Sequence, residues 1–171
     1  MKNTIISLLI LFFLISIIGT LLPGCVDSGL DIDSIDSAVY RFQDSSVDPY
    51  YHRSYTITIT ESEVSISVDV YGDIIAEKNY SIVNEDFEHI KTVIKNAGVS
   101  NTTYPPNPGC AGGKGESLSF YVKEELFFSG DVYHCGGSDS GNLGGDLESI
   151  QAALTALIPD FEELLAIEYL K

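Results

Sequence analysis

The sequence predicts an α+β domain, in which an antiparallel sheet of about five strands, a meander plus a hairpin, carries helices on one face. Apolar and polar residues alternate with a period of two between residues 55 and 82, and again between residues 118 and 132. Two other segments, 87–97 and 147–157, instead show apolar residues at helical spacing. Alternation on one side only is typical of a sheet whose single buried face packs against helices.

The meander is the clearest of these elements. Strands are expected at residues 38–42, a short first one, and then at residues 55–60, 64–70 and 74–82, which form the three strands of the meander. Aligning the apolar faces of the second and third segments pairs Ile59 with Val64 and Ile57 with Ile66. This register predicts a tight antiparallel hairpin.

A second hairpin is expected from strands at 118–122 and 126–132. The register that buries one face pairs Val122 with Leu126, Phe120 with Phe128 and Leu118 with Gly130. The glycine-rich segments that flank this hairpin, 109–115 and 136–145, are predicted to be loops.

Helix signals complete the pattern. Asn84 is expected to cap a helix that ends at Gly98, and Asp146 to cap a second one. Pro159 interrupts that second helix, and residues 161–170 are expected to form a final helix.

The N-terminal segment has the features of an export signal. Lys2 precedes an apolar stretch over residues 5–18, and the stretch is followed by Leu22-Pro23-Gly24-Cys25. This tetrapeptide resembles the lipobox of prokaryotic lipoproteins. An uncleaved transmembrane helix over residues 5–22 is the alternative, because about 20 apolar residues cross a bilayer.

The lipobox resemblance covers residues 1–25 only and implies a processing event. In that family the cysteine thiol receives a diacylglycerol and the preceding peptide is removed. Residues 1–24 would then be a signal peptide, and Cys25 would anchor the chain to the lipid bilayer. We expect a lipidated acidic tether over residues 25–37 and a single domain over residues 38–171, on the extracytoplasmic side of the cell membrane.

The chain is strongly acidic, with a formal net charge of −16. Loss of Lys2 with the leader leaves eight basic residues against 25 acidic ones, a charge near −17. Such a surface argues against nucleic acid as a partner, because Lys and Arg supply most of the affinity for phosphates. It is compatible with simple solubility and with attraction of a basic protein.

The remaining cysteines are expected to pair with each other. Lipid on Cys25 leaves Cys110 and Cys135 in a compartment that permits disulfides, and the hairpin register brings them within about three residues of facing positions. Zinc bound by these cysteines and His134 is the alternative, but adjacent His134 and Cys135 lack the usual ligand separation. No metal and no cofactor is predicted.

One loop concentrates aromatic and basic groups in this acidic chain. Tyr50, Tyr51, His52 and Arg53 follow one another there, and Tyr and Arg are favoured at binding centres. We take these four residues and His134 as candidate binding residues. The alternative for the tyrosines is that they only cover a sheet edge.

The function predicted from these features is non-catalytic binding by a membrane-anchored protein. One alternative is an inhibitor or immunity protein against a cationic enzyme. Small acidic lipoproteins that block lysozymes resemble the chain in charge, anchor and disulfide, although the domain shares no motif with them. The other is a small hydrolase using His52 or His134, although the sequence has no Gly-x-Ser-x-Gly elbow.

Overall fold

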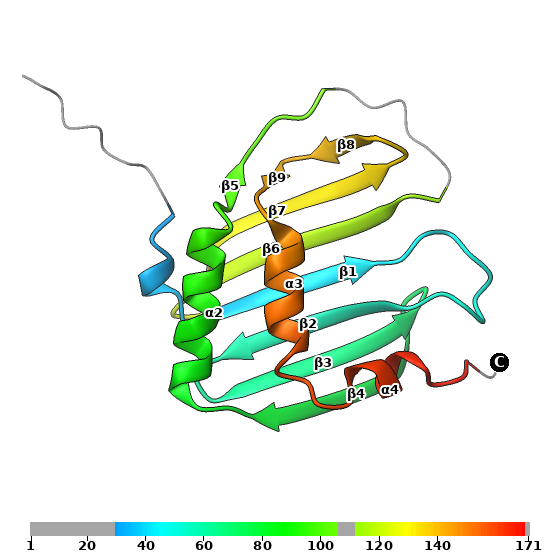
Figure 1. Ribbon diagram of the computed structural model, residues 1–171, viewed down its shortest axis with the longest axis horizontal. Helices are drawn as coiled ribbons and strands as arrows, with labels where there is room; N and C mark the ends of the chain where they lie inside the picture. The colour runs from blue at the N-terminus through cyan, green and yellow to red at the C-terminus, as the bar shows by residue number, and fades with distance from the viewer. Residues whose placement is uncertain (1–29, 106–111, 170–171) are drawn as a thin grey trace, which may run out of the picture.

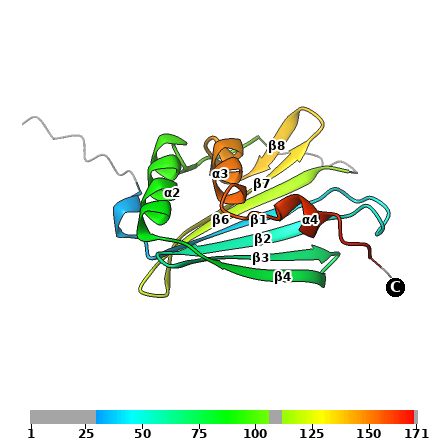
Figure 2. The same ribbon diagram turned by 60° about the horizontal axis from the view of Figure 1, so that its bottom comes forward.

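A seven-stranded antiparallel sheet with helices on one face forms the body of the computed structural model, which describes residues 30–105 and 112–169 (Figures 1 and 2). The α+β class is therefore confirmed. The expected number of about five strands is wrong, because the main sheet of the described part has seven in the order β4-β3-β2-β1-β6-β7-β8. A separate two-stranded ladder joins β5 to β9.

The strands of the main sheet are β1 (Ser37–Gln43), β2 (Ser54–Thr60), β3 (Glu63–Val70), β4 (Asp73–Ser81), β6 (Lys114–Val122), β7 (Glu125–Cys135) and β8 (Ser138–Gly141). The short ladder consists of β5 (Ser100–Asn101) and β9 (Leu143–Gly144). The helical elements are η1 (Ile32–Ser34), α2 (Asn84–Asn96), α3 (Leu147–Thr155) and α4 (Phe161–Leu165).

Strand β1 lies at the centre of the sheet and joins the two predicted hairpins. Tyr40 pairs with Ile57 of β2 on one side and with Leu118 of β6 on the other. The sequence indicates a short first strand but not which strands lie beside it. Period-two alternation indicates which face of a strand is buried, and it does not identify the strands that pair.

Strand β8 arises from a segment that the sequence predicts to be a loop. Gly136 and Gly137 have φ values of 52° and 99°, the left-handed conformation that a two-residue hairpin turn requires at both central positions. The glycines therefore form a turn, and the residues after them return along β7 as an edge strand.

The predicted registers are largely confirmed. Ile57 lies opposite Ile66 in the first hairpin, and Phe120 lies opposite Phe128 in the second. Val122, however, faces Glu125 and not Leu126, because an irregularity between Phe120 and Tyr121 shifts the register by one residue. The shift allows a two-residue turn at positions 123 and 124, where both φ values are positive.

The helix boundaries differ from expectation at two places. Asn84 is the first residue of α2 and not its cap; Val83 occupies the cap position, and its N–H donates to the Asp86 carboxylate at 3.1 Å. Asp146 caps α3 as predicted, accepting from the Ser149 N–H at 3.1 Å. The final helix is shorter than residues 161–170, because α4 ends at Leu165.

The core lies between the helices and the covered face of the sheet (Figure 2). Its fully buried side chains include Tyr40, Ile57, Phe87, Ile90, Phe120 and Ile150. The helices turn their apolar stripes onto the alternating apolar positions of the strands, and this burial is the main favourable term in folding.

The folded part begins earlier than the predicted boundary at residue 38. Ile32 and Ile35 are buried, at 4% and 2% exposure, and the Asp36 N–H donates to the Tyr121 carbonyl at 2.9 Å. Residues 32–36 therefore pack onto the domain, within the range expected to be a solvated tether. Cys25 and the rest of residues 1–29 lie outside the described residues. None of the helices in the described ranges is long and apolar enough to span a bilayer.

Candidate functional site

A cavity of about 530 Å³ opens beside α3, where β1 and β7 end and β6 begins. Its walls combine carboxylate, imidazole, ammonium, amide and aromatic groups with three glycines. The lining residues are Phe42, Gly112, Gly113, Lys114, Glu116, His134, Gly136, Glu148 and Gln151. A concave site with a few convergent polar groups is the usual form of a ligand site.

A chain of hydrogen bonds runs along the wall of this cavity. The buried Tyr40 hydroxyl donates to Oε1 of Glu116. Oε2 of Glu116 lies 2.8 Å from Nε2 of His134, and Nδ1 of His134 lies 2.9 Å from Oδ1 of Asp139. A carboxylate only accepts, so two carboxylate partners require both ring nitrogens to donate, which favours the imidazolium form of His134.

The titration of these groups follows from their surroundings. Burial lowers the pKa of His134, but the hydrogen bonds and negative charges of Asp139 and Glu116 outweigh it, and the net shift is upward from the ordinary 6.5. Burial, reinforced by the bond to Glu116, raises the pKa of Tyr40 far above its ordinary value. Tyr40 therefore remains a protonated donor that fixes the Glu116 carboxylate.

The strand registers bring this chain of groups together. His134 lies directly opposite Asp139 in the β7–β8 hairpin and directly opposite Lys114 in the β6–β7 pair. At Gly113 the strands approach so closely that a Cβ would lie 2.5 Å from the His134 carbonyl oxygen. Glycine is therefore required at that position for the backbone to pass beside His134.

Other residues that line the cavity add further polar groups. Nζ of Lys114 lies 5.6 Å from the centre of the Phe42 ring, within the range of a cation–π contact. On α3, the Gln151 amide donates to the Tyr55 hydroxyl, and Glu148 is exposed beside it.

His52 is buried at 2% exposure and does not reach this cavity. Its ring stacks on Tyr71 with centroids 3.8 Å apart, and its Nδ1 accepts from the Tyr71 N–H at 3.4 Å. Its Nε2 lies 3.4 Å from the hydroxyl of Ser54, which is itself 1% exposed. This serine–histidine pair is oriented by a backbone N–H, where a catalytic triad has a carboxylate.

The other residues of the candidate loop differ in exposure. Tyr50 and Tyr51 are 50% and 71% exposed, and their rings meet edge to face at 5.1 Å. The Arg53 guanidinium instead donates to the carbonyls of Leu165 at 2.9 Å and Ile167 at 2.6 Å. Arg53 therefore ties the C-terminal segment to the sheet.

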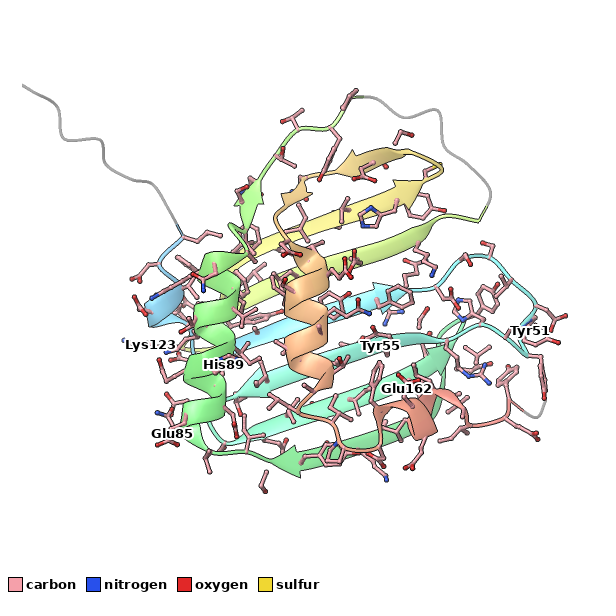
Figure 3. All side chains as sticks on the ribbon, viewed as in Figure 1. Tyr51, Tyr55, Glu85, His89, Lys123 and Glu162 are labelled. Carbon is pink, nitrogen blue, oxygen red and sulfur yellow. The ribbon has the colours of Figure 1, made fainter. Side chains whose placement is uncertain are left out.

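The predicted site residues thus fall into two groups at one end of the sheet. His134 belongs to the cavity, whereas residues 50–53 form a neighbouring loop; Figure 3 labels Tyr51 at this end and Lys123 at the opposite end. Cys110 lies outside the described residues, and Cys135 is 6% exposed. Their disulfide stays a prediction.

Sequence reasoning misses Tyr40, Glu116 and Asp139. A signal for Glu116 is present, because positions 116, 118 and 120 alternate on one strand and the last two are buried in the core. A carboxylate in an inward-facing series costs free energy unless it is paired, and it therefore indicates a partner.

Among residues 30–105 and 112–169, no group of three or more His, Cys, Asp or Glu side chains is arranged to hold a metal ion. Comparison of the sequence with protein-family models gives no match, and a search of curated proteins also finds no similar chain.

Proposed function

We propose that this protein is a membrane-anchored extracytoplasmic binding protein whose cavity accepts a cationic group of a basic partner. The observation that carries the proposal is the Glu116 carboxylate, which is 13% exposed and held by Tyr40 and His134 at the wall of an open cavity. The net charge of −16 supplies long-range attraction for such a partner.

The cavity has the chemistry that an ammonium or guanidinium group needs. Tyr40 and His134 occupy only part of the acceptor capacity of Glu116, since a carboxylate offers about four lone-pair sites. Glu148 adds a second carboxylate from α3. The face of Phe42 holds the Lys114 ammonium, so a cation of the partner would use this face by displacing Lys114.

The arrangement supports binding over hydrolysis. Both ring nitrogens of His134 are taken by carboxylates, so neither is left to activate a serine hydroxyl. His52 does contact a hydroxyl, but Ser54 is buried away from any substrate. An inhibitor or immunity role against a cationic enzyme would be one form of the binding function proposed here.

Cation binding is testable with a small probe. We expect N-acetyl-arginine methylamide to bind the full-length chain in detergent micelles, and the neutral N-acetyl-glutamine methylamide not to bind. Glu148→Gln should weaken binding about threefold to fivefold, the range for a partly exposed ion pair. Titration followed by NMR shifts of Gly113 and Gln151 measures this effect.

Glu125→Gln is the matched control, because it removes the same charge from an exposed position at the β6–β7 turn, far from the cavity. It should leave the affinity unchanged. Equal losses of affinity in Glu148→Gln and Glu125→Gln would show that only net charge attracts the probe. NMR shift changes confined to residues outside the cavity would contradict the proposal.

The membrane anchor is a separate part of the proposal and has its own test. Cys25→Ser should move the protein from the membrane fraction to the soluble fraction, because no thioether-linked diacylglycerol can form. Intact-mass measurement of the wild type should show the mature chain beginning at Cys25 with added lipid. A variant that stays in the membrane with unchanged mass would favour the uncleaved helix.

A further inference from the structure

We propose that a tyrosine-rich surface, at the end of the sheet that also holds the cavity, is a docking site for a Lys- or Arg-bearing segment of another protein. This surface, the tyrosine tip, consists of Val47, Tyr50, Tyr51, Tyr71 and Ile167. The inference goes beyond the cavity proposal, since none of these residues lines the cavity.

The tip is continuous although its residues come from three parts of the chain. The Tyr71 hydroxyl donates to the Val47 carbonyl at 2.5 Å, which ties the β3–β4 turn to the β1–β2 loop. Arg53 joins that loop to the C-terminal segment, with its Nη1 3.5 Å from the Pro49 carbonyl and its Nη2 2.6 Å from the Ile167 carbonyl.

All five side chains are exposed to solvent. The exposed fractions are 39% for Val47, 50% for Tyr50, 71% for Tyr51, 53% for Tyr71 and 37% for Ile167. Single exposed apolar residues are ordinary on protein surfaces, but a contiguous group of large ones marks an interaction site. The expectation that Tyr50 and Tyr51 only cover a sheet edge does not account for rings this exposed.

The tip is also held in place before any partner arrives. Tyr71 stacks on the buried ring of His52 at 3.8 Å. Asp48 fixes the loop, because its side chain accepts from the Tyr50 N–H at 2.9 Å and its carbonyl accepts from the Tyr51 N–H at 2.8 Å. Ordered tyrosines bind at a low cost in conformational entropy, which is why they serve as anchors in interfaces.

The position of the tip disfavours the bilayer as its occupant. The described chain begins near η1, at the end of the sheet where Lys123 is labelled, whereas Tyr51 lies at the opposite end (Figures 1 and 3). The seven residues of β1 alone separate these ends by about 23 Å. Under the proposed anchor, the tip would lie at the end of the domain away from the attachment point.

The negative charge around the tip favours a partner that carries Lys or Arg. Asp48 lies in the β1–β2 loop between Val47 and Tyr50, and Glu168 follows Ile167. The neighbouring Arg53 guanidinium donates to backbone carbonyls and is therefore not available to an acidic partner. Tyrosine faces bordered by carboxylates attract Lys and Arg through cation–π and ionic contacts. A net charge of −16 repels an acidic partner.

The test uses a fluorescent twelve-residue peptide carrying four arginines among Gly and Ser, titrated against the full-length chain in detergent micelles at 150 mM NaCl. We expect the double variant Tyr50→Ser, Tyr51→Ser to bind at least tenfold more weakly, the size of a hot-spot loss. This change leaves the net charge unaltered, so general electrostatic attraction is the same in both proteins. The double change to Phe keeps the ring faces and should retain binding.

The control is Phe127→Ser, which removes an exposed aromatic ring, 42% exposed, from strand β7 outside the tip. It should leave the affinity unchanged, and the peptide with glutamine in place of arginine should not bind. Equal affinity of the wild type and the Tyr→Ser double variant would overturn the proposal. Loss of phosphatidylcholine vesicle binding in that variant, with peptide binding retained, would assign the tip to the membrane and also overturn it.

Failure of the tip proposal can be distinguished from failure of the cavity proposal, because Glu148→Gln alters the cavity and leaves the tip intact. If Glu148→Gln weakens binding of the small arginine probe while the Tyr→Ser double variant does not affect the peptide, the cavity proposal stands and the tip proposal fails. The reverse pattern would support the tip and contradict the cavity proposal. Thermal melts of all variants confirm that each remains folded.

Discussion

Replacing Phe120 with alanine is expected to lower the free energy of unfolding by about 4 kcal/mol. Phe120 is fully buried on β6, and its ring stacks on Phe128 of β7 with centroids 5.4 Å apart. Removing the ring takes away its transfer free energy and leaves a cavity in the middle of a sheet that cannot collapse around it. Urea unfolding followed by far-UV circular dichroism measures the change.

Phe127→Ala provides the matched control for this substitution. Phe127 lies next to Phe128 on the same strand but is 42% exposed. Its loss should change the free energy of unfolding by no more than about 0.5 kcal/mol. Similar losses in the two variants would mean that the hairpin register is not the one described, because a one-residue slip exchanges the buried and exposed positions.

Replacing Glu116 with alanine is expected to cost about 2 kcal/mol at pH 6, because it removes the acceptor of the buried Tyr40 hydroxyl and one partner of His134. The loss should shrink at high pH. His134 has a raised pKa in the folded state, so its pairing stabilises the protein fully below the ordinary value of 6.5. That contribution is lost as the pH rises through the raised pKa.

Urea unfolding at intervals from pH 6 to pH 9 measures this dependence. Glu116→Gln removes the charge but keeps the shape, so the pKa of His134 should fall and the pH dependence in this range should flatten. The NMR titration of the His134 ring protons reports the pKa directly. Glu148→Ala is the control: Glu148 lines the same cavity and is exposed, so its loss should stay within about 0.5 kcal/mol. If the free energy of unfolding of Glu116→Gln depended on pH in the same way as that of the wild type, this account would be contradicted.

Cation binding in the cavity should show the opposite dependence on pH. Loss of the His134 proton makes the group formed by Glu116, His134 and Asp139 more negative by one charge. We therefore expect the arginine probe to bind more tightly over the same pH range in which the folded state loses stability.

The meander and the second hairpin are predictable because neighbouring strands in them are joined by short turns. A tight turn limits the possible registers, and only one of these buries Ile57 against Ile66 or Phe120 beside Phe128. The position of β1 is not predictable in this way. A loop over residues 44–53 separates β1 from β2, and β6 begins some 70 residues after the end of β1, so local alternation does not restrict its partners.

The candidate site is predictable only in part, for a related reason. The residue type and position of His134 mark it as a binding candidate, but its partners come from β6 and β8, and the hydroxyl that fixes Glu116 comes from β1. The segment that carries Asp139 has the composition of a loop, so its alignment opposite His134 has no basis in the sequence. Arg53 belongs to a residue type that favours interfaces, yet its guanidinium is occupied by the C-terminal segment.

Local patterns in the chain are enough to establish the class of the fold, the faces of the strands and most of the hairpin registers, because these depend on periodicities and turns within a few residues. Long-range packing, in contrast, places β1 between the two hairpins, joins Tyr40, Glu116 and His134 by hydrogen bonds, and leaves Tyr50 and Tyr51 exposed. The Tyr40–Glu116 hydrogen bond alone joins residues 76 positions apart, and the formation of such contacts depends on how the whole chain excludes water from a single core.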